Sequence, residues 1–437
     1  MSKTIQINDI AVLNKKTYKK DEFPEVVYYL DTGSLTKNSI EALQKLNVKL
    51  DKVPSRAQRK VQKNTILYST VRPNQEHFGI IENIIDDLVV STGFTTIDVI
   101  DSGVDSKFLY YLITQNHLTE YLHSVAQNSV SSYPSISPND IGSLTFNIPE
   151  SIEHQKQIAK VLSDLDAKIE VNNKINQELE SLAKSIYDYW FVQFDFPDQN
   201  GKPYRSSGGK MLYNEELKRE IPEGWEVKRL GDFAEIKRGK LITEKTANLS
   251  GNVKVVSAGI DYSYVHDEAN REKYTITVSG SGANAGFVNF WREPIFANDC
   301  TTVIGRNDFE TFVILQFLKL RQEYILKQAR GSAQPHVYPK DLAALKILIP
   351  NSDLFESYGQ KVLALNEKIS NNDKENQKLA ALRDWLLPML MNGQVTVKSS
   401  DEVRDQDKKI LNQVQDDNKQ VQDDSLDRVA EEVEKYS

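Results

Sequence analysis

Two long stretches of the chain each contain a seam, a series of mostly apolar residues at alternating spacings of four and three. In the first stretch these positions are Ile158, Leu162, Leu165, Ile169, Asn172, Asn176, Leu179, Ala183, Ile186 and Trp190. In the second stretch they are Tyr358, Val362, Leu365, Ile369, Asn372, Asn376, Leu379, Arg383, Leu386 and Leu390, each 200 residues later. This heptad spacing predicts two long helices that pack along one seam. Because proline cannot continue a helix, Pro388 predicts the end of the second one.

Two asparagines interrupt each apolar seam at the same places. Polar residues at buried seam positions cost stability but fix register and orientation. In an antiparallel pair, Asn172 lies level with Asn376, and Asn176 lies level with Asn372. We therefore predict that these four residues set the stagger of the helices and the distance between the two halves of the chain. The sequence also allows each seam to pack only onto its own half.

The rest of the chain is duplicated as well. Residues 133–149 match 334–350 at an offset of 201, 63–69 resemble 273–279, and 8–11 resemble 231–234. Each half predicts a β-rich globular domain followed by a long helix, an α+β fold with an internal repeat. The predicted organisation is a first recognition domain, a helix, a linker, a second recognition domain, a second helix and a charged tail, at 1–150, 151–195, 196–223, 224–352, 353–392 and 393–437.

Composition narrows the class of protein. The 437 residues exceed one ordinary domain, and no apolar run approaches the ~20 residues that span a bilayer. The N-terminus lacks a signal-peptide pattern, so we expect a cytoplasmic protein without a membrane contact. The single cysteine, Cys300, excludes an intramolecular disulfide and a cysteine-based zinc site.

The net charge of −8 does not exclude a nucleic-acid partner. Residues 399–437 hold 12 acidic and 6 basic side chains, a net of −6, which leaves −2 (−8 minus −6) for the other residues. A nearly neutral body can still present local basic loops to phosphates.

We find no pattern of catalytic residues. A phosphate-binding G-x-x-x-x-G-K-[ST] loop is absent, and the glycines from Gly280 to Gly286 do not fit G-x-G-x-x-G. The segment after them alternates like a strand, which predicts a hairpin. Asp232 lies too close to Glu235 and Lys237 for a nuclease pattern, and the six histidines show no metal-ligand spacing. We expect neither catalysis nor a metal site in this chain.

Several segments together resemble the DNA-specificity subunit of type I restriction–modification systems. They are the paired helices, the FDFPDQNGKPYRSSGGKM linker with IPEGWEVKRLGDFAEIKRGK, the TITVSGSGANAGFVNF segment and GSAQPHVYPKDLAALKILIP. The resemblance spans residues 1–395. It implies two target-recognition domains that each read half of a split site on double-stranded DNA, with the helices setting the gap. It also implies two methyltransferase subunits, ATP-driven restriction subunits and a role in defence against foreign DNA. S-adenosylmethionine, ATP and Mg²⁺ would then belong to the partners.

Base reading requires donors and acceptors on loops, and phosphate binding requires lysine or arginine. Candidates in the first domain are Lys52, Arg56, Arg59, Lys60, Arg72, Asn74, Gln75 and His77. Candidates in the second are Lys237, Arg238, Lys240, Ser281, Asn284, Arg330, Ser332, Gln334 and His336. Each could instead be an ordinary solvated loop residue. We predict that Arg72→Ala weakens one half-site and Gln334→Ala the other. The alternative function is a duplicated coiled-coil scaffold that bridges two identical partners without reading DNA.

Overall fold

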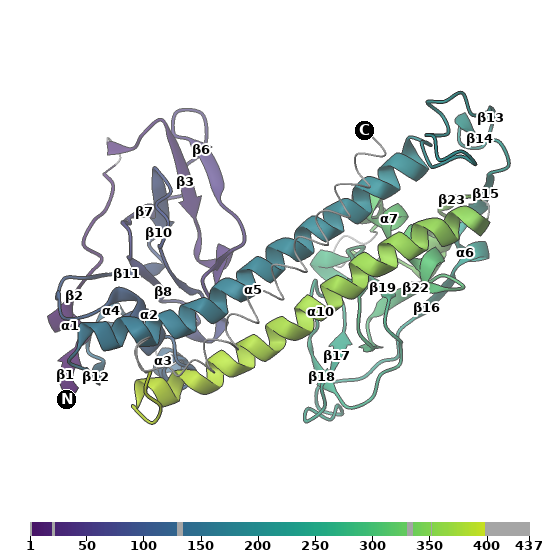
Figure 1. Cartoon of the computed structure of the whole chain (residues 1–437). Coiled ribbons are helices and arrows are strands. Elements are labelled where there is room, and N and C mark those ends of the chain that lie inside the picture. Colours follow the sequence, from purple (N-terminus) through teal and green to yellow (C-terminus); the bar gives the residue numbers. More distant parts are fainter. Residues whose placement is uncertain (1, 20–21, 129–133, 330–334, 351, 398–437) are drawn as a thin grey trace. The chain divides into compact units, whose positions relative to one another are not determined.

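The computed structural model describes residues 2–19, 22–128, 134–329, 335–350 and 352–397 (Figure 1). The chain forms two compact units. Of the described residues, the first unit contains 2–169 and 378–397, and the second contains 170–377. Each unit holds one β-rich region and one segment of each long helix. No helix in the described ranges is long and apolar enough to cross a membrane.

The first β-rich region has two four-stranded sheets. One is antiparallel with the order β2-β11-β8-β9, formed by β2 (Ala11–Leu13), β11 (Phe94–Val99), β8 (Ile66–Ser69) and β9 (Phe78–Ile80). The other has the order β6-β3-β10-β7, formed by β6 (Gln44–Asn47), β3 (Val26–Leu30), β10 (Leu88–Ser91) and β7 (Ala57–Lys60). Its central strands β3 and β10 are parallel. Strands β8 and β10 are buried at every position, which explains why their sequences do not alternate.

Short elements complete this region. Two strand pairs are β1 (Ser2–Gln6) with β12 (Thr145–Pro149), and β4 (Leu35–Thr36) with β5 (Ser39–Ile40). The helices are α1 (Ile7–Ile10), α2 (Ser106–Ile113), α3 (Asn116–Gln127) and α4 (Pro138–Gly142), with 3₁₀ turns η2 (Thr32–Ser34) and η3 (Pro73–Gln75). Asp105 caps the N-terminus of α2, where its carboxylate accepts a hydrogen bond from the Phe108 N–H at 2.9 Å.

The second β-rich region repeats this plan. Its antiparallel sheet has the order β16-β22-β19-β20, formed by β16 (Glu235–Arg238), β22 (Cys300–Ile304), β19 (Thr275–Ser279) and β20 (Val288–Trp291). A three-stranded sheet has the order β18-β17-β21, formed by β18 (Tyr264–His266), β17 (Val253–Val256) and β21 (Ile295–Ala297). The remaining elements are β15 (Glu226–Arg229) paired with β23 (Lys346–Ile349), α6 (Leu230–Phe233), η5 (Gly282–Asn284), α7 (Asp308–Leu320), α8 (Gln322–Gln328) and α9 (Pro339–Ala343).

The two regions share three strand pairings, although the first region has additional strands, β7 and the β4–β5 pair. Each is closed by a pair of its first and last strands, β1 with β12 and β15 with β23. Each contains one parallel pair, β3 with β10 and β17 with β21. Each also has an antiparallel hairpin, β8–β9 and β19–β20. The predicted α+β class and internal repeat are confirmed, and the glycine-rich segment forms a hairpin as its pattern indicated.

The long helices are α5 (Ile152–Tyr187), which continues as a π-helical turn η4 (Asp188–Val192), and α10 (Ser352–Met391). At 1.5 Å per residue they are roughly 55–60 Å long. The expectation that Pro388 ends the second helix is wrong, because α10 includes it and continues to Met391. Leu387, Leu390 and Met391 are buried in the core of the first unit. Their burial offsets the hydrogen bond that proline removes from the last turn.

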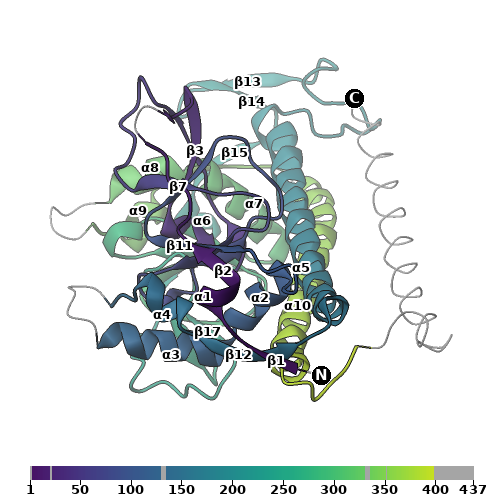
Figure 2. The ribbon, with the colours of Figure 1, turned by 90° about the vertical axis from the view of Figure 1, so that its left-hand side faces the viewer.

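The segment 196–223, predicted as a surface linker, contains a hairpin of β13 (Met211–Asn214) and β14 (Arg219–Pro222). This hairpin lies beside the C-terminal end of α5 (Figures 1 and 2). Aromatic rings anchor the segment, since Phe196 stacks on Tyr204 at 4.6 Å and on Trp225 at 5.3 Å between ring centroids. The same core includes Tyr358 of α10, whose ring lies 5.1 Å from that of Phe191.

Candidate DNA interface

In the first region, the β8–β9 loop presents polar side chains on a constrained backbone. Arg72 and Glu76 both have left-handed backbone angles, with φ of 48° and 56°. Val71 forms a β-bridge with Ser135, and the Arg72 N–H donates to the Pro134 carbonyl at 2.9 Å. The loop is thus fixed to the segment that precedes α4. Its exposed side chains are Arg72, Asn74 and Gln75. His77 is turned inward, with Nδ1 2.8 Å from the Leu35 carbonyl oxygen.

The basic cluster of the first region divides into two groups. The Thr92 N–H donates to the Arg56 carbonyl and the Thr70 N–H to the Gly93 carbonyl, both at 2.8 Å, which brings Arg56 to the same end as the β8–β9 loop. Lys52 and Arg56 are exposed. Lys60 is committed elsewhere, since its ammonium lies 3.0 Å from Glu22 and 4.3 Å from the centre of the Tyr18 ring.

Arg59 is half-buried, and burial lowers its pKa. Its Nε has no hydrogen-bond acceptor among the described residues. An unsatisfied buried donor is costly, so this group is a candidate for an acceptor supplied from outside the chain.

In the second region, the β19–β20 loop occupies the equivalent place. Ser281 forms a β-bridge with His336, the counterpart of the Val71–Ser135 bridge. The Val337 N–H donates to the Gly280 carbonyl and the Gly282 N–H to the Pro335 carbonyl, both at 3.1 Å. Gly282 has a φ of 76°, which favours glycine at this position. The two hairpin loops therefore share a position in the topology and differ in their side chains.

One carboxylate organises the base of this second loop. Asp299 accepts a hydrogen bond from the Ser281 hydroxyl at 2.8 Å and from the Arg238 guanidinium at 3.2 Å. Ser281 and Arg238 therefore hold the base of the β19–β20 loop through Asp299. Lys237 forms an ion pair with Glu235 at 2.8 Å on the same strand.

The remaining candidates of the second region lie nearer its surface. Lys240 is exposed, and Asn284 is half-buried in the loop. His336 stacks on Tyr338 at 6.0 Å, and the Lys340 ammonium lies 5.7 Å from the centre of the Tyr338 ring. Arg330, Ser332 and Gln334 lie outside the described residues.

Another loop packs beside each of the two hairpins, and the sequence did not indicate it. In the first region, the β4–β5 turn packs on the hairpin, because the Ile80 N–H donates to Asn38 Oδ1 at 2.7 Å. In the second region, residues 257–263 do the same, because Asn289 donates to the Ile260 carbonyl at 2.7 Å. Ile40 and Ile260 are both exposed. The two loops share no sequence, so only the common topology identifies them as equivalent.

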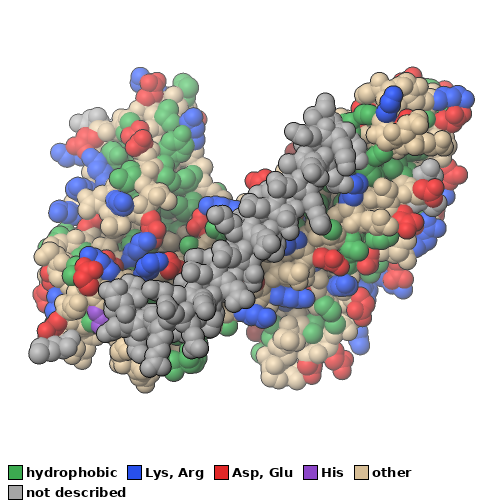
Figure 3. All heavy atoms as spheres, in the orientation of Figure 1, with side chains coloured by type: hydrophobic (Ala, Val, Ile, Leu, Met, Phe, Trp, Pro, Cys, Tyr) green, Lys and Arg blue, Asp and Glu red, His purple; other side chains and the backbone are tan. Residues whose placement is uncertain are grey.

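Lys15 is a further candidate for a phosphate contact that was not predicted, although the internal repeat indicates it. It follows β2 as Arg238 ends β16, and the match of 8–11 to 231–234 puts these two residues at the same position. Lys15 is exposed. On the face in Figure 3, lysine and arginine side chains are interspersed with acidic ones over both β-rich regions. Local loops, and no single basic patch on that face, thus carry the candidate phosphate contacts.

Within the second unit, the two long helices run antiparallel and exchange hydrogen bonds between their asparagines. Asn172 Nδ2 donates to Asn376 Oδ1 and to Glu375 Oε2, each at 2.8 Å. Asn372 Nδ2 donates to Asn176 Oδ1, also at 2.8 Å. Asn172 and Asn372 are almost fully buried.

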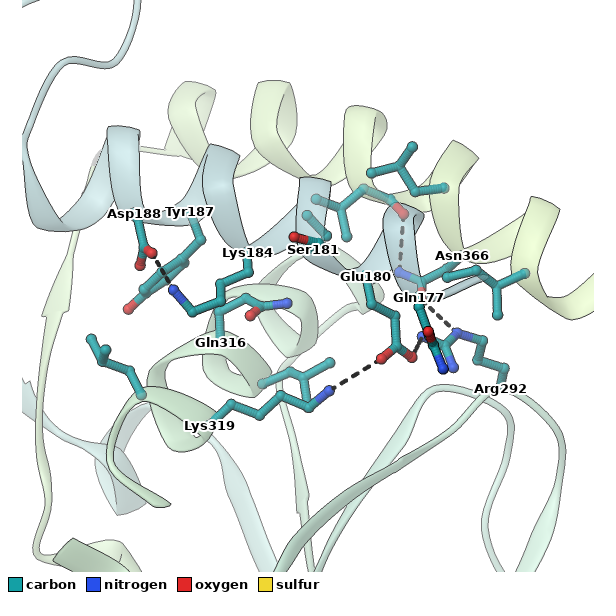
Figure 4. Close-up of a pocket in the computed structure, with 16 residues that line it drawn as sticks. Gln177, Glu180, Ser181, Lys184, Tyr187, Asp188, Arg292, Gln316, Lys319 and Asn366 are labelled. Atoms are coloured by element: carbon teal, nitrogen blue, oxygen red, sulfur yellow. Dashed lines mark hydrogen bonds and ion pairs between the residues drawn. The ribbon is translucent and has the colours of Figure 1, made fainter. Parts of the chain in front are cut away.

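Each β-rich region is held to both helices by a polar contact. In the first unit, Asp166 of α5 accepts from the Tyr111 hydroxyl and from the Arg383 guanidinium of α10, both at 2.6 Å. In the second unit, Arg292 donates to Glu180 of α5 at 2.7 Å and to Asn366 of α10 at 2.8 Å. Arg292 reaches both helices at the edge of a groove of about 360 Å³ between them and α7 (Figure 4). In each unit a charged side chain thus joins the β-rich region and both long helices.

Metal-binding chemistry has no support in the described residues, where no three His, Cys, Asp or Glu side chains gather to hold an ion. Cys300 is buried, and burial raises the pKa of its thiol to about 12.

Known proteins are similar to this chain in sequence. The chain matches the type I restriction modification DNA specificity domain over residues 2–181 and 222–381. It is 27% identical to the type I restriction enzyme HindI specificity subunit of Haemophilus influenzae, over 90% of this chain and 99% of the relative. It is 28% identical to the MjaIX specificity subunit of Methanocaldococcus jannaschii, over 77% and 78%.

A similar fold occurs in the crystal structure of a type I restriction-modification S subunit from M. genitalium. The TM-score is 0.52 at 19% identity, over 92% of this chain and 97% of the other. At this identity the likeness concerns the fold alone. Because the family match covers most of both halves, the chain belongs to the type I restriction–modification DNA specificity subunits, the non-catalytic component that directs modification and restriction.

Proposed function

We propose that the chain recognises a bipartite target in double-stranded DNA, with one half-site read by each β-rich region. The observation that carries this proposal is the equivalence of the β8–β9 and β19–β20 loops. Both are pinned by the same kind of β-bridge, Val71 to Ser135 and Ser281 to His336. The same backbone position therefore presents different donors and acceptors in the two regions, as two readers of different sequences require.

The candidate residues take different roles in this proposal. Arg72, Asn74 and Gln75 would contact base edges, because they are exposed on a fixed loop. Asn284 would do so in the second region. Lys52, Arg56 and Lys240 are exposed and form no ion pair with a described residue, so they are suited to phosphates.

The catalytic partners belong to the same proposal. Two methyltransferase subunits and the restriction subunits would assemble with this chain in the cytoplasm. S-adenosylmethionine, ATP and Mg²⁺ would bind to those partners. The support is family membership.

The test is a pair of loop variants, assayed for methylation of duplex libraries in which either half-site is randomised. Arg72→Ala is expected to relax selection in one half-site and Asn284→Ala in the other. Lys63→Ala is a matched control, because Lys63 is an exposed cation before β8, at the opposite end of that strand from the loop. Equal effects of both variants on both half-sites, or no effect of either, would reject the assignment.

A further inference from the structure

Three arginines gather in the second unit where the linker meets α5 and α7. The Arg219 guanidinium carbon lies 5.0 Å from the centre of the Phe194 ring. The backbone N–H of Arg205 donates to the Phe194 carbonyl at 3.2 Å, which puts Arg205 beside Arg219. The Arg321 guanidinium carbon lies 4.1 Å from the centre of the Phe317 ring. The charges of Arg219 and Arg321 both act on the Tyr187 hydroxyl, so that residue lies near both.

None of these three guanidinium groups has a hydrogen-bond or ion-pair partner within the described part of the chain. The nearby carboxylates are engaged elsewhere. Asp195 accepts from the N–H and the hydroxyl of Ser206 at 2.7 and 2.6 Å. Asp188 pairs with Lys184.

The arginines also act on one another. Burial lowers the pKa of Arg321, and the positive charge of Arg219 lowers it further. Burial likewise lowers the pKa of Arg219, to which the charge of Arg205 adds. Neighbouring cations without an anion between them repel, and an oxyanion bound among them would remove that cost.

The geometry suits a phosphate. A guanidinium that lies flat on an aromatic ring keeps its N–H edges available, and its planar fork matches two phosphate oxygens. The guanidinium carbons of Arg219 and Arg321 each lie over an aromatic ring, that of Phe194 and that of Phe317. A lysine cluster could attract an anion, but it would not present paired donors in a plane.

The cluster adjoins the second reading hairpin. Gln322 follows Arg321 directly, and its side chain binds that hairpin at two points. Its Oε1 accepts from the Val288 N–H and its Nε2 donates to the Gly286 carbonyl, both at 2.8 Å. Where α7 meets α8, Gln322 therefore supports the hairpin, and Arg321 directly before it presents a cation. The matching α2–α3 connection holds Thr114 and Gln115, neither of them cationic, so the feature belongs to the second region.

We propose that Arg205, Arg219 and Arg321 form a phosphate clamp on the DNA backbone beside the half-site read by the second region. This inference rests on the proposed function of that region. Phosphate contacts hold a protein in register on the duplex, while base contacts specify the sequence. The clamp would thus contribute affinity for any duplex and no preference among sequences.

The experiment measures how the affinity for duplex DNA depends on salt, using the assembled complex and a duplex without a target sequence. The slope of log K against log salt is negative, and each lost phosphate contact reduces its magnitude by about 0.9. The double variant Arg219→Gln/Arg321→Gln is expected to reduce this magnitude by about 2, and to weaken binding to target and non-target duplexes by the same factor. The single variant Arg205→Gln, an exposed residue, is expected to lower it by about 1. This single variant keeps the test informative if the double variant does not fold.

The matched control is Lys210→Gln/Lys346→Gln, which also removes two cations from this surface. Both already pair with acids, Lys210 with Glu223 at 2.6 Å and Lys346 with Glu216 at 2.7 Å. We expect the control to leave the slope unchanged. An unchanged slope in the arginine variants would overturn the clamp, as would unchanged DNA binding with weaker assembly of the methyltransferase subunits. Lost discrimination between half-sites at an unchanged slope would overturn the clamp and leave the proposed function standing.

Discussion

Asn172 and Asn376 meet between the two long helices, where Nδ2 of the first donates a 2.8 Å hydrogen bond to Oδ1 of the second. Asn372 and Asn176 make the reciprocal bond, also of 2.8 Å. A slip of either helix would leave buried amides without partners, at about 1–3 kcal/mol for each group. The exchange therefore favours one alignment over its neighbours. That these residues set the spacing of the half-sites remains a prediction.

Replacing all four asparagines with leucine is expected to leave the helices folded and to broaden the accepted spacing between half-sites. An all-apolar seam packs almost equally well in several registers. The measurement is methylation of duplexes whose half-sites are separated by different numbers of base pairs. Leu365→Ile is the control, because it changes an apolar seam residue without a polar contact. A variant that still accepts a single spacing would show that the asparagines do not set it.

Gly359→Ala is expected to destabilise the protein by about 1–3 kcal/mol, by overpacking. Alanine usually stabilises a helix by about 1 kcal/mol relative to glycine. Here an added Cβ would lie 2.2 Å from Cγ of Phe309, so α10 could not keep its contact with that side chain. Chemical unfolding measures the difference. The control is Gly33→Ala, where nothing lies within 4 Å of the added Cβ. If Gly359→Ala unfolds at a higher denaturant concentration than the native chain, the close contact is not real.

The stability of the first and second units is expected to fall above pH 9. Burial raises the pKa of Cys300 to about 12, from 9.0, and that of Tyr68 to about 12, from 10.0. In the unfolded chain both groups ionise at the lower values, while the folded chain keeps them neutral. Rising pH therefore favours the unfolded state between these values. Urea unfolding from pH 8 to 11 measures the loss, and Cys300→Ala is expected to reduce the slope.

Thiol labelling at pH 8 checks the same burial independently. The native chain is expected to resist a thiol reagent that labels the urea-unfolded chain at once, because the thiolate is the reactive form. Immediate labelling of native Cys300 would contradict its placement.

The sequence predicted the repeated features of this fold because each has a periodic or duplicated signal. The heptad spacing located both helices, and the offset matches located the equivalent hairpins. Pairings between distant residues have no such signal. Nothing in the local sequence indicates that Glu22 engages Lys60, or that Asp299 holds Ser281 and Arg238. The effect of Pro388 was mispredicted, because burial of Leu390 outweighs the local effect of the proline on α10.

The unpredicted parts of the candidate interface have a common cause. The 257–263 loop and the arginine cluster depend on which segments the topology brings together. Arg219 and Arg321 are separated in the sequence by most of the second β-rich region, and neither belongs to a motif. The alternative of a scaffold without a DNA role is set aside by the family match over both halves.

The most direct test of the account is a map of methylated bases in genomes with and without this gene. We expect the gene to be required for methylation of one motif, made of two short defined halves separated by a fixed number of unspecified base pairs. We also expect Arg72→Ala to change the sequence accepted in only one of those halves. An unchanged methylation map after deletion, or loss of a motif without an internal gap, would contradict two separate readers in one chain.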